Sequence, residues 1–130
     1  MQNQNKKEVY KMEIYRNEIY LANLGKCNGS IQAEIRPVVI IQNNIGNKHS
    51  PTTIIAPITS KLEKSKIPTH VYITHNKLEK NSLILCEQIQ TINKTQLLKR
   101  ISKIINFETQ EKINNAIKIS LGLEEDYARK

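Results

Sequence analysis

The stretch that decides the fold is GSIQAEIRPVVIIQNNIGNKHSPTTIIAPITSK, residues 29–61. It holds two runs rich in β-branched residues, IRPVVIIQ at 35–42 and TTIIAPIT at 52–59, and such runs predict strands. Between them, residues 43–47 are mostly Asn and Gly, which tolerate a positive φ, so the segment predicts a turn. We expect the two strands to be antiparallel neighbours, because the connection is too short for a crossover helix.

Three further runs of β type extend the pattern in both directions: EIYLANL at 18–24, HVYI at 70–73 and SLILCEQIQTI at 82–92. The chain therefore contains at least five short strands. Residues 38–41 and 83–86 are apolar on both alternating faces, which is typical of strands covered on both sides. We expect these two segments to form the middle of the sheet.

The C-terminal stretch has helical periodicity instead. Apolar and small residues recur at i, i+3, i+4, i+7 and i+8 on one stripe, formed by Ile113, Ala116, Ile117, Ser120 and Leu121. Asn106 is a suitable N-cap and Gly122 a suitable stop, which predicts one amphipathic helix over 107–121. The fold class is therefore mainly β (α+β): a small, strongly bent antiparallel sheet or barrel with a C-terminal helix over one side.

The 130 residues suffice for one domain. We expect a polar N-terminal extension at 1–16, a folded domain at 17–124 and a charged tail at 125–130. Nothing in the first thirty residues resembles a signal peptide, and no apolar run approaches the roughly 18 residues of a membrane span. The sequence thus predicts a soluble, cytoplasmic protein that does not contact a membrane.

Basic residues exceed acidic ones by 20 to 12, a net charge of +8. This excess favours a polyanionic partner such as nucleic acid or an acidic protein segment, although a biased genome composition is an alternative source of the lysines. Cys27 and Cys86 lie far apart without a CxxC motif, so we interpret them as ordinary thiols. With one Phe and five Tyr, the chain has few aromatic platforms for a pure RNA-binding module.

Common enzyme motifs are missing from the sequence: it has no glycine-rich phosphate loop, no HExxH and no GxSxG. We therefore expect neither a cofactor nor a metal. His49, His70 and His75 could suggest acid–base catalysis, but their spacing does not support a pair. We interpret them as solvated or hydrogen-bonding residues outside the site.

Arg36 is the polar residue that most requires an explanation. It directly precedes Pro37, which favours an extended backbone, and its strand is otherwise largely apolar. Taken alone, the residue has two interpretations. Its guanidinium could serve a functional site, or its stem could lie along the core edge while the head reaches water or pairs with Glu34.

Residues 29–61 resemble the core of the MazF/PemK toxins. The shared pieces are GS-x-Q before the arginine of RPV, QN-x-IGN at the turn, SPT at the next strand start and ITSK at its end. The resemblance continues through RNEIYLANL at 16–24, IPTHV at 67–71, LILCEQIQTINKTQL at 83–97 and INNAIKISLGL at 113–123. It covers about residues 16–123, and the order and spacing of the motifs make it specific.

The resemblance implies an SH3-like, PemK/CcdB-type barrel that forms a homodimer. It implies sequence-selective, metal-independent cleavage of single-stranded RNA, and inhibition by a MazE-like antitoxin with an acidic C-terminal tail. Carried over through the motifs, Arg36 and Thr59 are the catalytic residues. The loop 74–81 should border the RNA groove, and the expected RNA-binding residues are Ser30, Gln32, Asn43, Asn44 and Ser60.

Several positions depart from the family pattern. Asn17 and Glu18 replace a Gly-Asp pair, Gln90 replaces an arginine and Asn93 an aspartate. Ile31 stands where many members have Glu, and Glu34 where many have Gly. Glu34 could replace the missing acid or neutralise the arginine two residues later. The alternative function is therefore a catalytically weak or retargeted barrel that binds an antitoxin, RNA or a topoisomerase, and a plain DNA-binding module ranks third.

Overall fold

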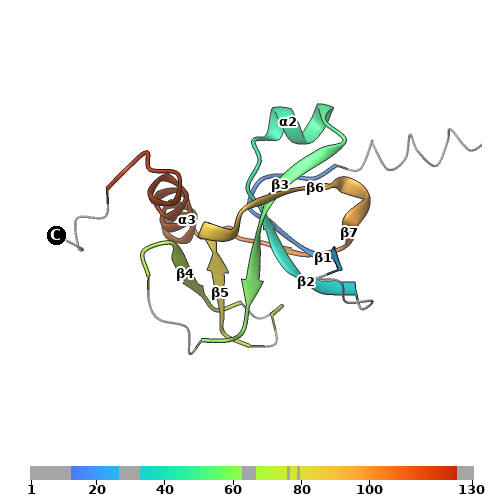
Figure 1. Cartoon of the computed structure of the whole chain (residues 1–130). Coiled ribbons are helices and arrows are strands. Elements are labelled where there is room, and N and C mark those ends of the chain that lie inside the picture. Colours follow the sequence, from blue (N-terminus) through green and yellow to red (C-terminus); the bar gives the residue numbers. More distant parts are fainter. Residues whose placement is uncertain (1–12, 27–32, 63–66, 76, 79, 126–130) are drawn as a thin grey trace, which may run out of the picture.

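A computed structural model describes residues 13–125 except 27–32, 63–66, 76 and 79. Over this part the chain forms seven strands, two α-helices and two short 3₁₀ helices (Figure 1). The strands are β1 (Glu18–Lys26), β2 (Ala33–Ile40), β3 (Thr52–Thr59), β4 (His70–Ile73), β5 (Ser82–Leu85), β6 (Gln90–Asn93) and β7 (Leu97–Lys103). The helices are α2 (Asn44–His49), η1 (Cys86–Gln88), η2 (Lys94–Gln96) and α3 (Phe107–Ser120).

The strands form one antiparallel sheet in the order β4-β5-β3-β2-β1-β7, with β6 added alongside β3. β3 is the spine, because its first half pairs with β6, its second half pairs with β5, and β2 lies along it as well. The sheet bends sharply around this strand without closing, and α3 covers its β4 and β5 side (Figure 1). The expected bent antiparallel sheet with a C-terminal helix is confirmed.

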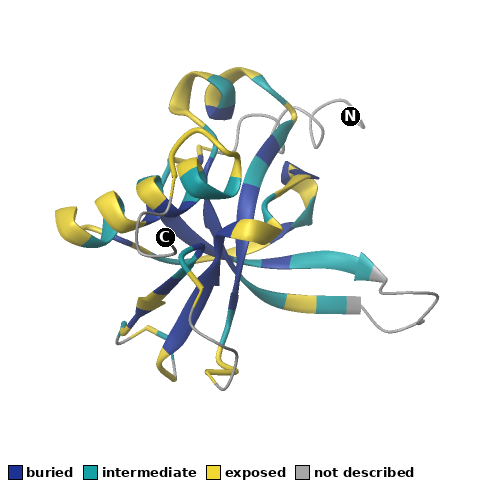
Figure 2. Cartoon of the chain, turned by 60° about the vertical axis from the view of Figure 1, so that its left-hand side comes forward, coloured by how far each residue is buried: buried dark blue, intermediate teal, exposed yellow. Residues whose placement is uncertain are grey.

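Two hydrophobic clusters occupy opposite faces of the sheet. Val39 belongs to the cluster that includes Ile113 and Ala116 of α3, whereas Val38 and Ile40 belong to the other cluster. All three β2 side chains are fully buried, so the run that is apolar on both faces contributes to two cores at once. Burying each is worth about 1.5–3 kcal/mol. Figure 2 shows this buried centre, from which the β1–β2 hairpin extends as a less buried arm.

The predicted C-terminal helix is confirmed, with both of its end signals. The side chain of Asn106 accepts a hydrogen bond from the backbone N–H of Thr109 at 2.9 Å. At the other end Gly122 adopts φ 74°, and the N–H of Leu123 donates to the carbonyl of Lys118, which is the Schellman arrangement. In the part of the chain that the structure describes, neither α-helix has the length and apolarity that a membrane span needs.

The predicted turn at 43–47 is wrong, because this segment begins the six-residue helix α2. Asn43 has φ −62° and caps the helix with its side chain, which accepts from the N–H of Gly46. A helix that starts with Asn-Ile-Gly-Asn has little intrinsic propensity, so tertiary contacts must hold it. Turn chemistry and helix capping use the same residue types, which explains the error.

A buried polar network supplies those contacts. The carbonyl of Asn47 has no helical donor four residues on, because that position is Pro51. The ammonium of the fully buried Lys94 donates to this carbonyl instead. The side chain of Asn47 donates to the carbonyl of Gln42 at 2.9 Å and accepts from the Thr53 hydroxyl at 2.8 Å. Desolvation by burial lowers the pKa of Lys94 below its ordinary value.

Two strand predictions need correction. The run 82–92 is not one strand, because η1 interrupts it between β5 and β6, which pair with different halves of β3. β7 was not predicted at all. Its residues 98–100 are all exposed, so this strand lacks the alternation of buried and exposed residues by which a strand is recognised in a sequence. Hydrogen bonding to β1 defines the strand instead.

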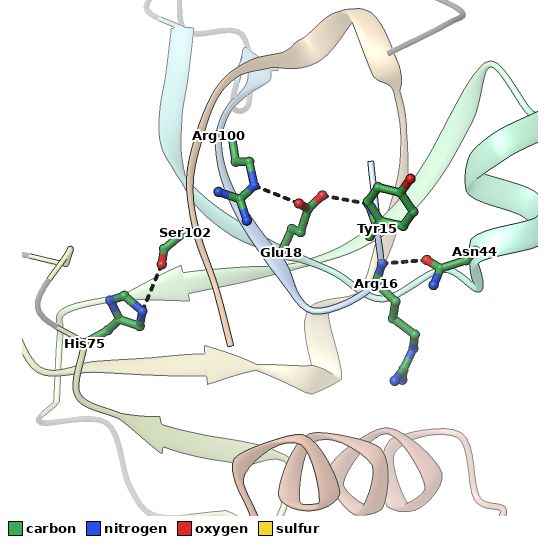
Figure 3. Close-up of polar contacts among 7 residues, drawn as sticks. All are labelled: Tyr15, Arg16, Glu18, Asn44, His75, Arg100 and Ser102. Atoms are coloured by element: carbon green, nitrogen blue, oxygen red, sulfur yellow. Dashed lines mark hydrogen bonds and ion pairs between the residues drawn. The ribbon is translucent and has the colours of Figure 1, made fainter. Parts of the chain in front are cut away.

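The chain just before β1 is fixed to the domain. Ile14 is buried in the second cluster, and the backbone N–H of Arg16 donates to the Asn44 side chain at 2.7 Å. Glu18 accepts from the N–H of Tyr15 and from Arg100, both at 2.7 Å (Figure 3). Glu18 thus retains an acid's role where the family has Asp. The predicted boundary between the N-terminal extension and the domain, at residue 16, stays a prediction. Ile14 and Arg16, on the extension side of it, already contact the domain.

Candidate active site

A cavity of about 530 Å³ opens beside the middle of β2 and the end of β3, next to the loop between β4 and β5. Its apolar lining comes from four strands and that loop, through Leu21, Ile35, Pro37, Ile58, Leu78 and Ile101. Its polar lining is Arg36, Thr59, Ser60, Lys61, Lys77, Lys80 and Ser82. Among the described residues no carboxylate lines this cavity, so its polar part favours an anion.

Arg36 and Thr59 reach the cavity from neighbouring strands. The register of β2 against β3 pairs Val38 with Pro57 and Val39 with Ala56. The pairing ends there, and the next residues of both strands, including Arg36 and Thr59, line the cavity. On its other side Arg36 pairs with Ala22 of β1. The sheet thus brings the two expected catalytic residues together, although they are far apart in the sequence.

Arg36 forms an ion pair with Glu34. The Nη2 atom lies 2.9 Å from Oε1, and the two side chains are 35% and 34% exposed. Residues i and i+2 share one face of a strand, which accounts for the contact. The pairing interpretation of Arg36 is therefore confirmed, and it coexists with a position at the cavity. A guanidinium has five N–H donors, so one contact to Glu34 leaves others for a phosphate.

Thr59 presents a hydroxyl whose oxygen is already held in place. Oγ1 accepts a hydrogen bond from the backbone N–H of Lys61 at 3.2 Å. The hydroxyl proton therefore remains free to donate to an anionic oxygen in the cavity. Ser60 follows directly and is exposed at the same wall. Both residues belong to the strand end that the ITSK motif marks.

Three lysines complete the polar rim. Lys77 and Lys80 belong to the loop 74–81, which was expected to border the RNA groove, and together with Leu78 they line this cavity. Lys61 is the last residue of ITSK. All three lysines are exposed. Sequence reasoning missed them individually, because the net charge of +8 was the available signal and it does not say where the charges gather.

Two of the other predicted RNA-binding residues, Asn43 and Asn44, do not line this cavity. Asn43 and Asn44 lie beyond the opposite end of β2, and their side-chain oxygens accept from Gly46 and Arg16. Asn43 and Asn44 therefore do not line the cavity that Arg36 lines, and their side chains cap and anchor α2, so their contact with RNA stays a prediction. Ser30 and Gln32 lie outside the described residues, as does Ile31.

None of the three histidines lines the cavity. His70 contacts the Glu87 carboxylate at 2.9 Å, and His75 contacts the Ser102 hydroxyl at 3.1 Å, which confirms the hydrogen-bonding interpretation for both. Burial acts to raise the pKa of Glu87, but hydrogen bonds from its own backbone and from His70 outweigh this and lower it. His49 lies in the last turn of α2.

The described cysteine is also outside the site. Cys86 is fully buried beneath α3, and desolvation, with a smaller contribution from Glu87, raises the pKa of its thiol to about 12. Because the thiolate is the reactive form, this cysteine is an ordinary buried thiol, as predicted. Cys27 lies outside the described residues. Within the described ranges, no three His, Cys, Asp or Glu side chains gather where they could hold a metal ion.

Comparison with known proteins identifies the family of this chain. Residues 15–121 match the family described as the PemK-like, MazF-like toxin of type II toxin-antitoxin systems. The chain belongs to this family. It is 52% identical over 107 residues to the endoribonuclease MazF of Staphylococcus saprophyticus, across 81% of this chain and 88% of that protein.

Solved structures share the fold. A mycobacterial endoribonuclease in complex with its cognate antitoxin superposes with a TM-score of 0.72 at 24% identity, over 87% of this chain and 99% of that one. A MazE–MazF structure from Deinococcus radiodurans gives a TM-score of 0.71 at 12% identity, over 86% and 98%. The resemblance to the MazF/PemK toxins is therefore confirmed in sequence and in fold.

Proposed function

We propose that this chain is a sequence-selective, metal-independent endoribonuclease toxin that cleaves single-stranded mRNA and so inhibits translation and growth. The observation that carries the proposal is the position of Arg36 and Thr59 at one cavity with a lysine rim. The name of the staphylococcal relative supports the same activity. The cavity offers donors and positive charge, which a phosphodiester requires.

The reaction that fits this site is attack by the ribose 2′-hydroxyl on its own 3′-phosphate. A bond forms between the 2′-oxygen and phosphorus, the bond to the 5′-oxygen breaks, and the products are a 2′,3′-cyclic phosphate and a 5′-hydroxyl. Negative charge grows on the equatorial oxygens, and Arg36 can donate two hydrogen bonds to them. Thr59 acts by position, holding a phosphate oxygen or the attacking hydroxyl.

This chemistry also defines the substrate. DNA lacks the nucleophile, and duplex RNA hides its base edges in a deep, narrow groove, so unpaired RNA fits best. Lys61, Lys77 and Lys80 would contact phosphates, which adds affinity without selecting a sequence. We retain Ser60, from its place at the cavity, and Ser30 and Gln32, from the family motif, as RNA contacts. For Asn43 and Asn44 the observed contacts support a structural role.

The test is an analysis of cleavage products. Purified protein is incubated in EDTA with a long unstructured RNA, and the 3′ ends of the fragments are identified by mass spectrometry. We expect cyclic phosphates at a short recurring motif. An oligonucleotide with a single 2′-deoxyribose at the mapped site should resist cleavage. Cleavage of that oligonucleotide, or loss of all activity in EDTA, would refute attack by the 2′-hydroxyl without a metal.

We further propose that the chain works as a cytoplasmic homodimer and is inhibited by a MazE-like antitoxin with an acidic C-terminal tail. The lysine rim supports this, because an acidic segment could occupy the same cavity as RNA. The mycobacterial neighbour is itself an endoribonuclease bound to its cognate antitoxin. A tail peptide that fails to compete with RNA for the wild-type protein would contradict the shared site.

The second candidate function is a catalytically weak or retargeted toxin. The contact of Glu34 with Arg36 favours it, because a carboxylate 2.9 Å from the guanidinium competes with the phosphate. In that case the chain would bind RNA or an antitoxin but release no fragments. Product analysis separates the two functions, since binding without cyclic phosphates supports only the second.

A further inference from the structure

His75 lies between the active-site cavity and a second, smaller one. It lines a cavity of about 280 Å³ at the junction of β4, the end of β7 and the start of α3. Two and three residues later, Lys77 and Leu78 line the active-site cavity. The same division holds on β7, where Ile101 lines the active-site cavity and Lys103 the smaller one. His75 therefore belongs to the wall that separates the two.

Both ring nitrogens of His75 are engaged. The backbone N–H of Lys77 donates to Nδ1 at 3.0 Å, so Nδ1 is an acceptor and the ring proton is on Nε2. Nε2 then donates to the hydroxyl of Ser102 on β7 at 3.1 Å (Figure 3). The carbonyl of His75 also accepts from the N–H of Leu78 at 3.0 Å. One imidazole thus shapes the loop and attaches it to the sheet.

Among the described residues the loop has two other attachments. The Ser82 hydroxyl at the start of β5 donates to the carbonyl of Lys80 at 2.9 Å, and Leu78 makes a contact of a different physical character. Leu78 packs against the first hydrophobic cluster, and such contact is not directional. Hydrogen bonds fix both distance and angle, so the imidazole sets where the loop points. The exposed ammonium groups of Lys77 and Lys80 form no ion pair with any described residue, which leaves them available to a phosphate.

We infer that His75 is a positioning residue, and that its bridge to Ser102 holds Lys77 and Lys80 where they bind the RNA backbone next to the scissile phosphate. The inference rests on the proposed function. His75 itself touches no reacting group, because both nitrogens are occupied and the ring is outside the active-site cavity. Its loss should therefore weaken substrate binding and spare the chemical step.

Asparagine at position 75 provides a selective variant. Its side-chain oxygen can accept from the N–H two residues on, as in an Asx turn, so His75→Asn retains the bond to Lys77. The shorter side chain cannot reach Ser102. Ser102→Ala removes the same bridge from the other side, and Ser120→Ala on α3 is the matched control for a lost hydroxyl. Thermal melting of each variant confirms that it is folded.

The probe is an oligoribonucleotide that spans a cleavage site mapped with the wild-type protein. We expect His75→Asn and Ser102→Ala each to raise KM about three- to fivefold, as for one lost hydrogen bond, with kcat within about twofold. The double variant should match the single ones, because both changes remove one bridge. The slope of log affinity against log salt should become shallower by up to about 0.7 for each lost phosphate contact.

Unchanged KM and salt slope in both single variants would overturn the positioning role, as would losses that add in the double variant. A merely structural role would lower stability without altering the salt slope. Binding of the same oligonucleotide with a 2′-deoxyribose at the scissile position separates the two proposals. If the wild type cleaves no RNA, the proposed function fails, while weaker binding of the long unstructured RNA by the variants still supports the bridge.

Discussion

The ion pair between Glu34 and Arg36 makes a quantitative prediction for Glu34→Gln. Arg36 Nη2 lies 2.9 Å from the carboxylate, and both side chains are about one-third exposed. Breaking such a partly exposed ion pair costs about 0.2–1 kcal/mol. A phosphate that binds Arg36 no longer has to meet this cost when Glu34 is replaced by Gln. A phosphate bound to Arg36 would lie about 6 Å from the carboxylate, where repulsion in water is about 0.7 kcal/mol. The two effects act in the same direction and total about 0.9–1.7 kcal/mol.

Glu34→Gln should therefore raise kcat/KM about five- to twentyfold, since 1.36 kcal/mol corresponds to a factor of ten. The assay is the initial rate of cleavage of a fluorogenic oligoribonucleotide below KM. Glu111→Gln on the exposed side of α3 changes the net charge equally and controls for long-range attraction of RNA. A rate for Glu34→Gln no higher than that of the control would refute the reasoning. A loss of activity would show instead that the carboxylate takes part in the reaction.

Three other predictions concern stability. Burial, helped by the negative charge of Glu18, raises the pKa of Tyr20 from 10.0 to about 12, so the folded state retains a proton that the unfolded chain loses. The free energy of unfolding should then fall between pH 10 and 12, and at pH 11 it should be about 1.4 kcal/mol lower than at neutral pH. Denaturant titrations of Tyr20→Phe should show a smaller decline over the same pH range. Lys94→Met should cost about 1–3 kcal/mol, because the Asn47 carbonyl loses its donor, and a normal denaturation midpoint would contradict the network. Asn106→Ala should cost about 1 kcal/mol through the lost cap of α3, measured as a lower Tm.

The parts of the fold that local chemistry determines were predictable. The helix at Phe107–Ser120 has its cap, stripe and stop in the sequence, and the runs at 35–42 and 52–59 are strands in an antiparallel pair. What sequence reasoning missed depends on partners distant in the chain. β7 is defined by pairing with β1, and α2 is held by Lys94, which lies 47 residues beyond Asn47.

The site divides in the same way. Arg36 and Thr59 were predicted through motifs, and both line one cavity because β2 and β3 are neighbouring strands. Lys77 and Lys80 could not be singled out, because a surface lysine has no local signature. The place of Asn43 could not be predicted for a different reason. Its residue type suits base recognition, loop chemistry and helix capping equally, and the structure uses it for the cap.

The most direct test of the central claim is cleavage of an unstructured RNA in EDTA by the wild type, Arg36→Ala and Thr59→Ala. Lys112→Ala, an exposed position on α3, controls for the loss of one basic or polar group. We predict cleavage by the wild type and the control, and a loss of at least about a hundredfold in kcat for Arg36→Ala, as for a removed oxyanion donor. Thr59→Ala should also be strongly impaired. Wild-type rates in both site variants would contradict the assignment of this cavity as the active site.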